Sequence, residues 1–458
     1  MKKRIRLNLI SVFVSLALIL AGCGDASSNT EQPETNNDKA GDESFAEGDG
    51  SGSGAVNVSD EGTTIRLVNN KLEIVAGLNE LAAKYEEESG VKVDIETIGG
   101  GEDTYAVLRN YLSKKTMPDI FVFEGDTQYD RFKKVLVDLS DEDWTKDTEA
   151  EYTVNGKVYG FPTTIEAIGL TYNKDILDKA GIDPASITGP ESMREAFEKL
   201  DAQKKELGLK AVIGYYTDAS YLWWSSGQHL FGTYLDSGLE RDDTTYIDMI
   251  NDGGQLDPER IQAFAEMIAL FNEYTDPDGI SGSYDDQIAG FASGKYAFVT
   301  QGSWIGAVLT GEDAGLYADA GNFEIGMIPY AFIEGQDTIQ TSCPAWWGVY
   351  KDGNVEASKE FLRWCEADNA AQEILTKRCD LIAPFDTCSY LPDDPFADTI
   401  AKYAAEGKTS DWHWQKWKDG LAQNATCVVF RDFAEGKITT SEEFANKLSE
   451  AVEAYYAR

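Results

Sequence analysis

Apolar and polar residues between positions 64 and 123 alternate between a strand-like and a helix-like repeat. Residues 73–88 carry apolar side chains every three or four positions, which predicts an amphipathic helix that Gly90 ends. A second helix is predicted to begin after Asp103, whose carboxylate can cap it. The predicted strands of this region are 64–69, 91–98 and 120–123. Strands that alternate with helices in this order predict a doubly wound α/β unit.

Ligands of doubly wound sheets bind beyond the carboxyl ends of the parallel strands. In this chain those ends lead into the loops 69–73, 99–103 and 124–128. The last of these loops carries Glu124 and Asp126, which are therefore candidate ligand-binding residues.

A long extended segment follows a predicted hairpin turn at Asn155-Gly156, where both residues tolerate the positive φ of a type I′ turn. The run 158–172 is rich in β-branched, aromatic and apolar residues, so it is predicted to be extended. Its 15 residues would span about 50 Å, more than one ordinary strand needs. We therefore expect the chain to leave one folded unit here and to enter another, with Glu166 in the middle of the passage. Asn173 is predicted to cap the helix that follows.

The rest of the chain continues to alternate helices with strands. An aromatic segment at 220–229 reads SYLWWSSGQH, and the residues after 365 are predicted to be mainly helical. The predicted helices are 192–207, 258–274 and 283–293, and the predicted strands are 211–216 and 296–301. No internal repeat is present in the sequence.

The chain of 458 residues carries a formal net charge of −40, from 40 basic and 80 acidic residues. Such a field repels nucleic acid and anionic lipid, so we expect neither as a partner. Evenly spread carboxylates are typical of a solvated surface and do not by themselves imply a cationic ligand. The 42% of hydrophobic residues is enough for one or two cores.

Residues 1–22 have the basic start and short apolar run of a signal peptide, too short for a transmembrane helix. The sequence Leu20-Ala21-Gly22-Cys23 resembles the lipobox of bacterial lipoproteins, which implies a diacylglyceryl anchor on Cys23. The alternative is an ordinary cleaved signal. Residues 23–62 are polar and predicted to form a flexible linker with a reach on the order of 35 Å. The expected location is extracytoplasmic, at the cell membrane.

Five cysteines follow the predicted anchor, all in the last third of the chain: Cys343, Cys365, Cys379, Cys388 and Cys427. Export permits disulfides, and a Cys379–Cys388 bridge would close the shortest loop, although the connectivity stays open. The cysteines form no C-x-x-C pair, so we expect no zinc site. We also expect no other metal and no cofactor.

Three segments resemble bacterial periplasmic sugar-binding proteins of the maltose-binding type. The first, VYGFPTTIEAIGLTYNKDIL at 158–177, is similar to the first crossover of that family. Residues 291–304 and 342–365 resemble its later segments, although Phe298 stands where Met is usual. The resemblance covers nearly all of 63–365.

This resemblance implies a periplasmic-binding-protein-like α/β fold, with two α/β lobes joined by three hinge crossovers and a ligand cleft between them. The expected crossovers are near 162–166, 297–302 and 343–348. The expected N-terminal lobe is 63–164 plus 300–344, and the expected C-terminal lobe is 165–299 plus 345–458.

Sugar sites combine aromatic rings, which stack on the C–H faces, with polar groups that pair with the hydroxyls. By resemblance Glu166 matches the family's cleft glutamate. Adjacent strand residues point to opposite faces, so at most one of Trp346 and Trp347 is expected to meet ligand. The aromatic candidates are Tyr221, Trp223, Trp224, Trp304, Trp346 and Trp347, with Trp412 and Trp414 as further ones; Arg378 and Asp386, which flank a cysteine-containing loop, are polar candidates.

The sequence has no catalytic motif, and its two histidines have no spaced metal-binding partner. We therefore interpret the chain as a monomeric lipoprotein, not an enzyme, that binds a carbohydrate and delivers it to the transmembrane subunits of an ABC importer. Two alternatives stay open. One is a secreted glycoside hydrolase, whose carboxylate pair no local motif reveals. The other is the same fold carrying a polyamine or another cation.

Overall fold

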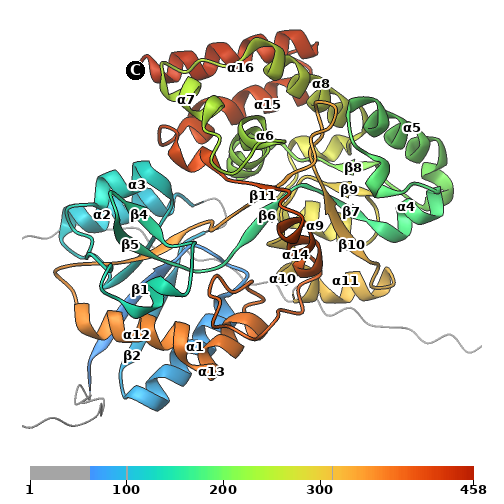
Figure 1. Ribbon diagram of the computed structural model, residues 1–458. Helices are drawn as coiled ribbons and strands as arrows, with labels where there is room; N and C mark the ends of the chain where they lie inside the picture. Colours follow the sequence, from blue (N-terminus) through green and yellow to red (C-terminus); the bar gives the residue numbers. More distant parts are fainter. Residues whose placement is uncertain (1–61, 100–101, 312) are drawn as a thin grey trace, which may run out of the picture. The chain divides into compact units, whose positions relative to one another are not determined.

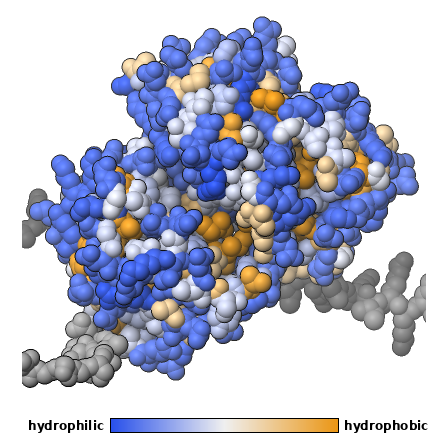
Figure 2. All heavy atoms as spheres, viewed as in Figure 1, coloured by the Kyte–Doolittle hydropathy of each residue, from blue (hydrophilic) through white to orange (hydrophobic). Residues whose placement is uncertain are grey.

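The computed structural model of the protein describes residues 62–99, 102–311 and 313–458 (Figure 1). The predicted signal peptide, Cys23 and the predicted linker up to residue 61 lie outside these residues. In the described ranges, every helix is too short or too polar to cross a membrane. Figure 2 shows hydrophilic residues over most of the face in view, as a strongly acidic chain requires.

The first lobe is built on a six-stranded sheet with the order β2-β1-β3-β12-β5-β4. Its strands are β1 (Thr64–Asn69), β2 (Lys92–Thr97), β3 (Ile120–Phe123), β4 (Tyr152–Val154), β5 (Lys157–Pro162) and β12 (Trp346–Val349). Strand β1 is parallel to β2 and β3, whereas β12 is antiparallel to β3 and β5. The helices of this lobe are α1 (Val75–Ser89), α2 (Thr104–Lys114), α3 (Gly125–Phe132), α12 (Val355–Ala367) and α13 (Asn369–Glu373). Every residue of β3 and β12 is buried, because helices cover both faces of the sheet.

The second lobe has a four-stranded sheet with the order β10-β7-β9-β8. Its strands are β7 (Leu170–Asn173), β8 (Ile213–Gly214), β9 (Phe298–Val299) and β10 (Ile325–Ile328). Its helices are α4 (Lys174–Ala180), α5 (Pro190–Leu207), α6 (Phe231–Asp236), α7 (Thr245–Asn251), α8 (Pro258–Tyr274), α9 (Tyr284–Ala292), α10 (Ile305–Thr310), α11 (Ala314–Asp319), α14 (Ala397–Ala405), α15 (Cys427–Ala434) and α16 (Ser441–Tyr456). Stacked rings of Phe197, Phe271 and Phe298 tie α5 and α8 to the sheet.

A third sheet of three short strands joins the two large ones, in the order β13-β11-β6. Its strands are β6 (Glu166–Ile168), β11 (Ile339–Ser342) and β13 (Thr409–Ser410). Strands β6 and β11 lie side by side and run antiparallel, with Ser342 opposite Glu166 (Figure 1). Strand β6 follows β5 of the first sheet and leads into β7 of the second, so the predicted extended passage is present. The chain crosses between the lobes here.

Several local predictions are confirmed. The hairpin between β4 and β5 turns at Asn155 and Gly156, whose φ angles of 52° and 73° are both positive. The Asp103 carboxylate accepts a 2.8 Å hydrogen bond from the Ala106 amide and caps α2. The Asn173 side chain likewise caps α4.

The division of the chain between the lobes differs from the expected one. Residues 300–330 belong to the second lobe, because β10 completes its sheet against β7. Residues 345–385 belong to the first lobe, because β12 is paired between β3 and β5 and α12 packs behind it. The expected crossover at 297–302 is therefore replaced by one after Phe385, which packs in the first lobe, and before Phe396, which packs in the second.

All five cysteines of the described chain are free thiols, so the Cys379–Cys388 bridge is not formed. Cys379 is buried against Gly77 of α1, and the Cys388 thiol lies 3.7 Å from the Thr376 hydroxyl. The two sulfur atoms thus have different neighbours in the structure.

Candidate ligand-binding site

A cavity of about 860 Å³ lies between the strand-end loops of the first lobe and an aromatic wall of the second. Its volume is within the range of about 300–1,000 Å³ that small-molecule sites occupy. All three loops predicted from the α/β pattern reach it. They contribute Asn70, Lys71, Leu72, Glu73, Gly99, Glu102, Asp103, Glu124 and Gln128.

The structure brings most of the predicted site residues to this cavity. The ones that line it are Glu124, Glu166, Tyr221, Trp223, Trp224 and Trp304, together with Trp414. They come from five separate parts of the chain. The sequence supplied their chemical type, and the loops and crossovers bring them together.

Trp346, Trp347 and Asp126 are not among the residues that line the cavity. The Trp346 indole donates a 2.7 Å hydrogen bond to the Ala150 carbonyl, and Trp347 stacks on Phe161. Both tryptophans are buried because β12 is an inner strand of the six-stranded sheet, with both faces covered. The expectation that Trp346 or Trp347 contacts the ligand is therefore corrected, because neither side chain lines the cavity.

The remaining candidates also lie away from the cavity. Asp126 accepts a 2.6 Å hydrogen bond from the Tyr152 hydroxyl. Arg378 pairs with Glu80 on the surface at 3.0 Å. Neither it nor Asp386 lines the cavity.

The aromatic wall is centred on His229. Its ring centroid lies 4.8 Å from that of Trp304, 5.5 Å from Trp414, 5.6 Å from Trp224 and 5.7 Å from Trp412. Burial lowers the pKa of His229 to about 3, and the charge of a nearby lysine adds to the effect. The imidazole is therefore neutral at physiological pH. The sequence indicated only that His229 has no metal-binding partner; its place in the aromatic segment 220–229, five positions after Trp224, was the available signal.

Trp304 is held in place by buried polar groups. Its indole donates a 3.0 Å hydrogen bond to the Gln301 side chain, which itself donates to Gln287 at 2.8 Å. The neighbouring Ser303 exchanges hydrogen bonds with the backbone of Ala167 on β6, at 3.0 and 2.9 Å. These contacts fix the ring beside the crossover strand and make it a rigid platform.

Lys71 is the cation of the cavity wall and was not among the predicted residues. Its ammonium group is paired with Glu166 and lies 3.0 Å from Glu73. Burial acts to lower the pKa of Lys71, but the two carboxylates outweigh it and raise the pKa. Glu166 is thus the partner of a lysine at the cavity wall.

Glu124 is a second polar group of the wall. Its carboxyl accepts a 2.8 Å hydrogen bond from the Asn70 amide. Burial raises the pKa of Glu124 to about 7, while Lys71 and Asn70 act in the opposite direction. At neutral pH this carboxyl is therefore both a hydrogen-bond donor and an acceptor.

Several buried polar atoms of the cavity wall have no hydrogen-bond partner among the described residues. They are the indole nitrogens of Trp223 and Trp414 and the Nδ1 atom of His229. Leaving a buried polar group unpaired costs about 1–3 kcal/mol, so these atoms are a cost to the ligand-free fold.

A second chamber of about 250 Å³ continues the cavity and is more polar. It shares Tyr105, Glu124, Trp223 and Trp414 with the main cavity. Its other walls include Arg109, whose guanidinium lies 4.5 Å from the centre of the Tyr105 ring. The two chambers together leave room for a ligand longer than the main cavity alone admits.

Comparison with known proteins places this chain in a family. The profile of the bacterial extracellular solute-binding proteins matches residues 80–402. A maltooligosaccharide ABC transporter solute-binding lipoprotein of Streptococcus pneumoniae serotype 4 is 26% identical over 350 residues, which are 73% of this chain and 72% of that protein. The melibiose/raffinose/stachyose-binding protein MelE of Bacillus subtilis is 31% identical over 132 residues, 28% of this chain and 29% of that protein.

Solved structures share the fold. The solute-binding protein RafE in complex with raffinose superposes with a TM-score of 0.67 and 18% identity, covering 86% of this chain and 99% of that one. A chitin oligosaccharide binding protein superposes with a TM-score of 0.70 and 16% identity over the same shares. The two-lobed α/β fold and the profile match confirm the resemblance seen in the sequence, and the chain belongs to the bacterial extracellular solute-binding proteins.

Proposed function

We propose that this protein binds an oligosaccharide in the cavity between its lobes and delivers it to the permease of an ABC importer. The observation that carries the proposal is the cavity wall. It combines a platform of tryptophans around a neutral histidine with polar side chains, among them Glu124 and Glu166. Indole faces stack on sugar C–H faces, and carboxyl oxygens accept hydrogen bonds from sugar hydroxyls.

The names of the relatives support the same class of ligand. Those named above bind maltooligosaccharides, or melibiose, raffinose and stachyose, and the solved neighbours hold raffinose or are named for chitin oligosaccharides. The volume of the main cavity and its polar extension suit an oligosaccharide better than a single sugar. Ligand would favour a closed arrangement of the lobes by its difference in affinity for the two states.

Delivery to a membrane permease rests on the sequence before the described residues. The lipobox-like run before Cys23 would place two acyl chains on the protein, enough for stable anchoring. The polar linker would then let a monomeric binding domain reach a permease in the same membrane. Labelling of growing cells with a radioactive fatty acid tests the anchor, because a Cys23→Ala chain would stay unlabelled.

Isothermal titration calorimetry of the purified domain tests the ligand class. The panel holds maltooligosaccharides, raffinose, stachyose and chitin oligosaccharides, with spermidine as the cationic alternative. We expect micromolar affinity for at least one oligosaccharide, a binding free energy of about −8 kcal/mol. A Trp224→Ala variant should bind it at least about tenfold more weakly. Binding of spermidine alone would support the polyamine alternative and contradict the proposal.

The glycosidase alternative has one observation in its favour. A carboxyl with a pKa of about 7, Glu124, shares the cavity with Glu166, which is paired with Lys71, and glycoside hydrolases use one protonated and one ionised carboxyl. Overnight incubation of the protein with its best ligand, followed by chromatography of the sugars, separates the two functions. We expect the ligand to be recovered intact, and the release of shorter sugars would support the hydrolase.

A further inference from the structure

The segment 411–417, which we call the tryptophan corner, forms part of the cavity wall through Trp414. It reads Asp-Trp-His-Trp-Gln-Lys-Trp and follows strand β13 directly. Trp412 and Trp414 lie on either side of His413 along the chain, and both rings pack on His229. Their placement therefore depends on what holds His413.

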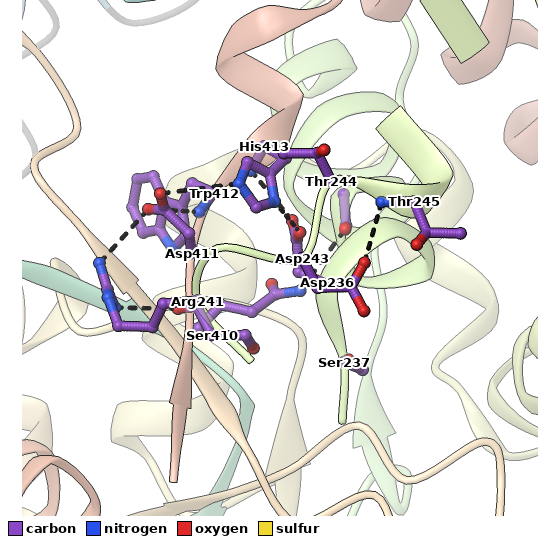
Figure 3. Close-up of polar contacts among 12 residues, drawn as sticks. Asp236, Ser237, Arg241, Asp243, Thr244, Thr245, Ser410, Asp411, Trp412 and His413 are labelled. Atoms are coloured by element: carbon purple, nitrogen blue, oxygen red, sulfur yellow. Dashed lines mark hydrogen bonds and ion pairs between the residues drawn. The ribbon is translucent and has the colours of Figure 1, made fainter. Parts of the chain in front are cut away.

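His413 is held by Asp236, the last residue of helix α6 (Figure 3). One carboxylate oxygen of Asp236 lies 2.7 Å from Nδ1 of the His413 ring, and the other accepts a 3.0 Å hydrogen bond from the His413 backbone N–H. Both residues are 2% exposed. A carboxylate at the C-terminal end of a helix is electrostatically unfavourable, and burial adds to that cost. The two hydrogen bonds from His413 compensate for it.

A second contact ties the corner to the crossover strands. The Arg241 guanidinium donates to the backbone and hydroxyl oxygens of Thr341 on β11, at 2.9 and 2.8 Å, and to the Ser410 carbonyl on β13 at 3.2 Å. It also pairs with Asp411 at 3.4 Å (Figure 3). The other carboxylate oxygen of Asp411 lies 3.9 Å from Nε2 of His413.

The corner also contacts the first lobe. The Gln415 amide donates a 2.9 Å hydrogen bond to the carbonyl of Cys343, in the crossover between β11 and β12. The Thr127 hydroxyl of α3 donates a 2.8 Å hydrogen bond to the Trp417 carbonyl. The corner thus meets both lobes and the cavity at once.

We propose that Asp236 and His413 are positioning residues of the ligand site, which act through Trp414 by fixing the tryptophan corner against the cavity. The inference rests on the proposed function, since the ligand is taken to be an oligosaccharide that contacts the Trp414 indole. Neither residue lines the cavity, so their effect on binding passes through the backbone and ring of the corner.

The protonation state of Asp236 decides which hydrogen bonds the pair makes. Burial raises the pKa of Asp236 to about 6, while the hydrogen bonds and charge of His413 act to lower it. Above about pH 6 the ionised carboxylate accepts both hydrogen bonds from His413. Below it the carboxyl carries a proton: its carbonyl oxygen still accepts from the His413 backbone N–H, and its O–H donates to Nδ1 once the ring carries its own proton on Nε2. Protonation of Asp236 therefore exchanges the direction of one hydrogen bond and keeps the corner held on both sides of about pH 6.

Four other charged groups lie around Asp236 and His413 and contribute to the electrostatic surroundings of the pair. Asp411 lies on the Nε2 side of the ring, and Arg241 partly neutralises it. Arg260 on α8 acts on Asp236 electrostatically, and Asp243 does so on His413. Glu124 titrates in the cavity itself, so a change of affinity with pH has to be read as a difference between two chains that both contain it.

Two substitutions of Asp236 separate positioning from simple destabilisation. Asp236→Ala removes both hydrogen bonds and should lower affinity for the best oligosaccharide about tenfold at pH 7.5. Asp236→Asn can keep both, because its oxygen accepts from the backbone N–H and its amide donates to a His413 ring that carries its proton on Nε2. This variant should bind within about threefold of wild type.

A double-mutant cycle tests the route through Trp414. Asp236→Ala should cost affinity in the wild-type chain but no more than about twofold in a Trp414→Phe background. An equal loss in both backgrounds, or an Asp236→Ala chain with wild-type affinity, would overturn the proposal. Glu142→Gln is the matched control, a buried carboxylate paired with Arg363 in the first lobe, and it should lower stability without changing affinity.

Two further measurements apply if the Asp236→Ala chain does not fold or if the wild type binds no oligosaccharide. If Asp236→Ala does not fold, His413→Ala takes its place, since it keeps the backbone hydrogen bond and removes only the ring. If no oligosaccharide binds the wild type, the proposed function fails. The positioning role is then judged by acrylamide quenching of the ligand-free protein, where Asp236→Ala should expose the Trp414 indole and Asp236→Asn should not. Unchanged quenching in both would refute it.

Discussion

Lys71, in the loop after the first strand of the first lobe, forms an ion pair with Glu166 on the crossover strand β6. The side chains are 15% and 8% exposed, so the pair is largely removed from water where it borders the cavity. Glu73 is a second partner of the same ammonium group. The pair joins a ligand loop of one lobe to the strand that leads to the other.

Removing one partner of this ion pair should destabilise the protein strongly. Lys71→Met leaves the carboxylates of Glu166 and Glu73 without their counter-charge and should lower the free energy of unfolding by about 3 kcal/mol at pH 7. Urea unfolding followed by tryptophan fluorescence measures it. Lys146→Met breaks an exposed pair with Asp143 and should cost no more than about 1 kcal/mol. Equal costs for both variants would contradict the burial argument.

His229 should make the protein sensitive to acid. Its pKa is about 3 in the folded protein against 6.5 for a free histidine, so the unfolded chain binds the extra proton first. Its contribution to stability is complete above about pH 6.5 and is lost as the pH falls towards 3, by about 1.4 kcal/mol per pH unit at most. His229→Phe should flatten this slope between pH 6 and 4 in urea unfolding. A variant with the slope of wild type would show that the imidazole is not buried neutral.

Two tryptophans with different surroundings should respond differently to truncation. Trp304→Ala removes a ring that lines the cavity and should lower sugar affinity by at least about tenfold. Trp346→Ala removes a core ring on β12 and should lower the free energy of unfolding by about 3–5 kcal/mol with little effect on affinity. Calorimetry and thermal unfolding of both variants check the contrast. If the Trp346 variant lost as much affinity as the Trp304 variant, β12 would contribute to ligand binding, which contradicts this prediction.

The hairpin at Asn155-Gly156 should show a purely conformational effect. Gly156 has a φ of 73° and open space around its Cα, so Gly156→Ala should cost about 1 kcal/mol without any clash. Gly315 in α11 also has open space but no positive φ, so Gly315→Ala should stabilise by about 0.5–1 kcal/mol. Thermal unfolding of the pair distinguishes backbone strain from loss of volume, because both changes add the same methyl group.

Most of the local secondary structure could be predicted from the sequence. The predicted strands 64–69 and 120–123 and the helix 258–274 have the observed bounds of β1, β3 and α8. Their repeat of apolar residues matches a single element, and glycine or a capping side chain marks their ends. The loops that carry ligand groups followed from the same pattern, because the carboxyl ends of parallel strands meet at one edge.

The lobe to which each later segment belongs could not be predicted in the same way. Residues 296–301 and 346–349 are both short apolar runs, and a short apolar run suits any inner strand of either sheet. Pairing decides between them: Phe298 lies opposite Tyr172 in the second lobe, and Trp347 lies opposite Val122 and Phe161 in the first. The tryptophans of β12 became core residues for this reason, not because of their own chemistry.

By itself the sequence determined the α/β class, the caps and turns, and the stock of aromatic and acidic side chains from which a sugar site can be built. Only the tertiary structure decided which of them meet. His229 lies among Trp224, Trp304, Trp412 and Trp414, which approach it from three separate parts of the chain, and Asp236 reaches His413 across 177 positions. Such contacts depend on the packing of whole lobes, and no local repeat of apolar and polar residues encodes them.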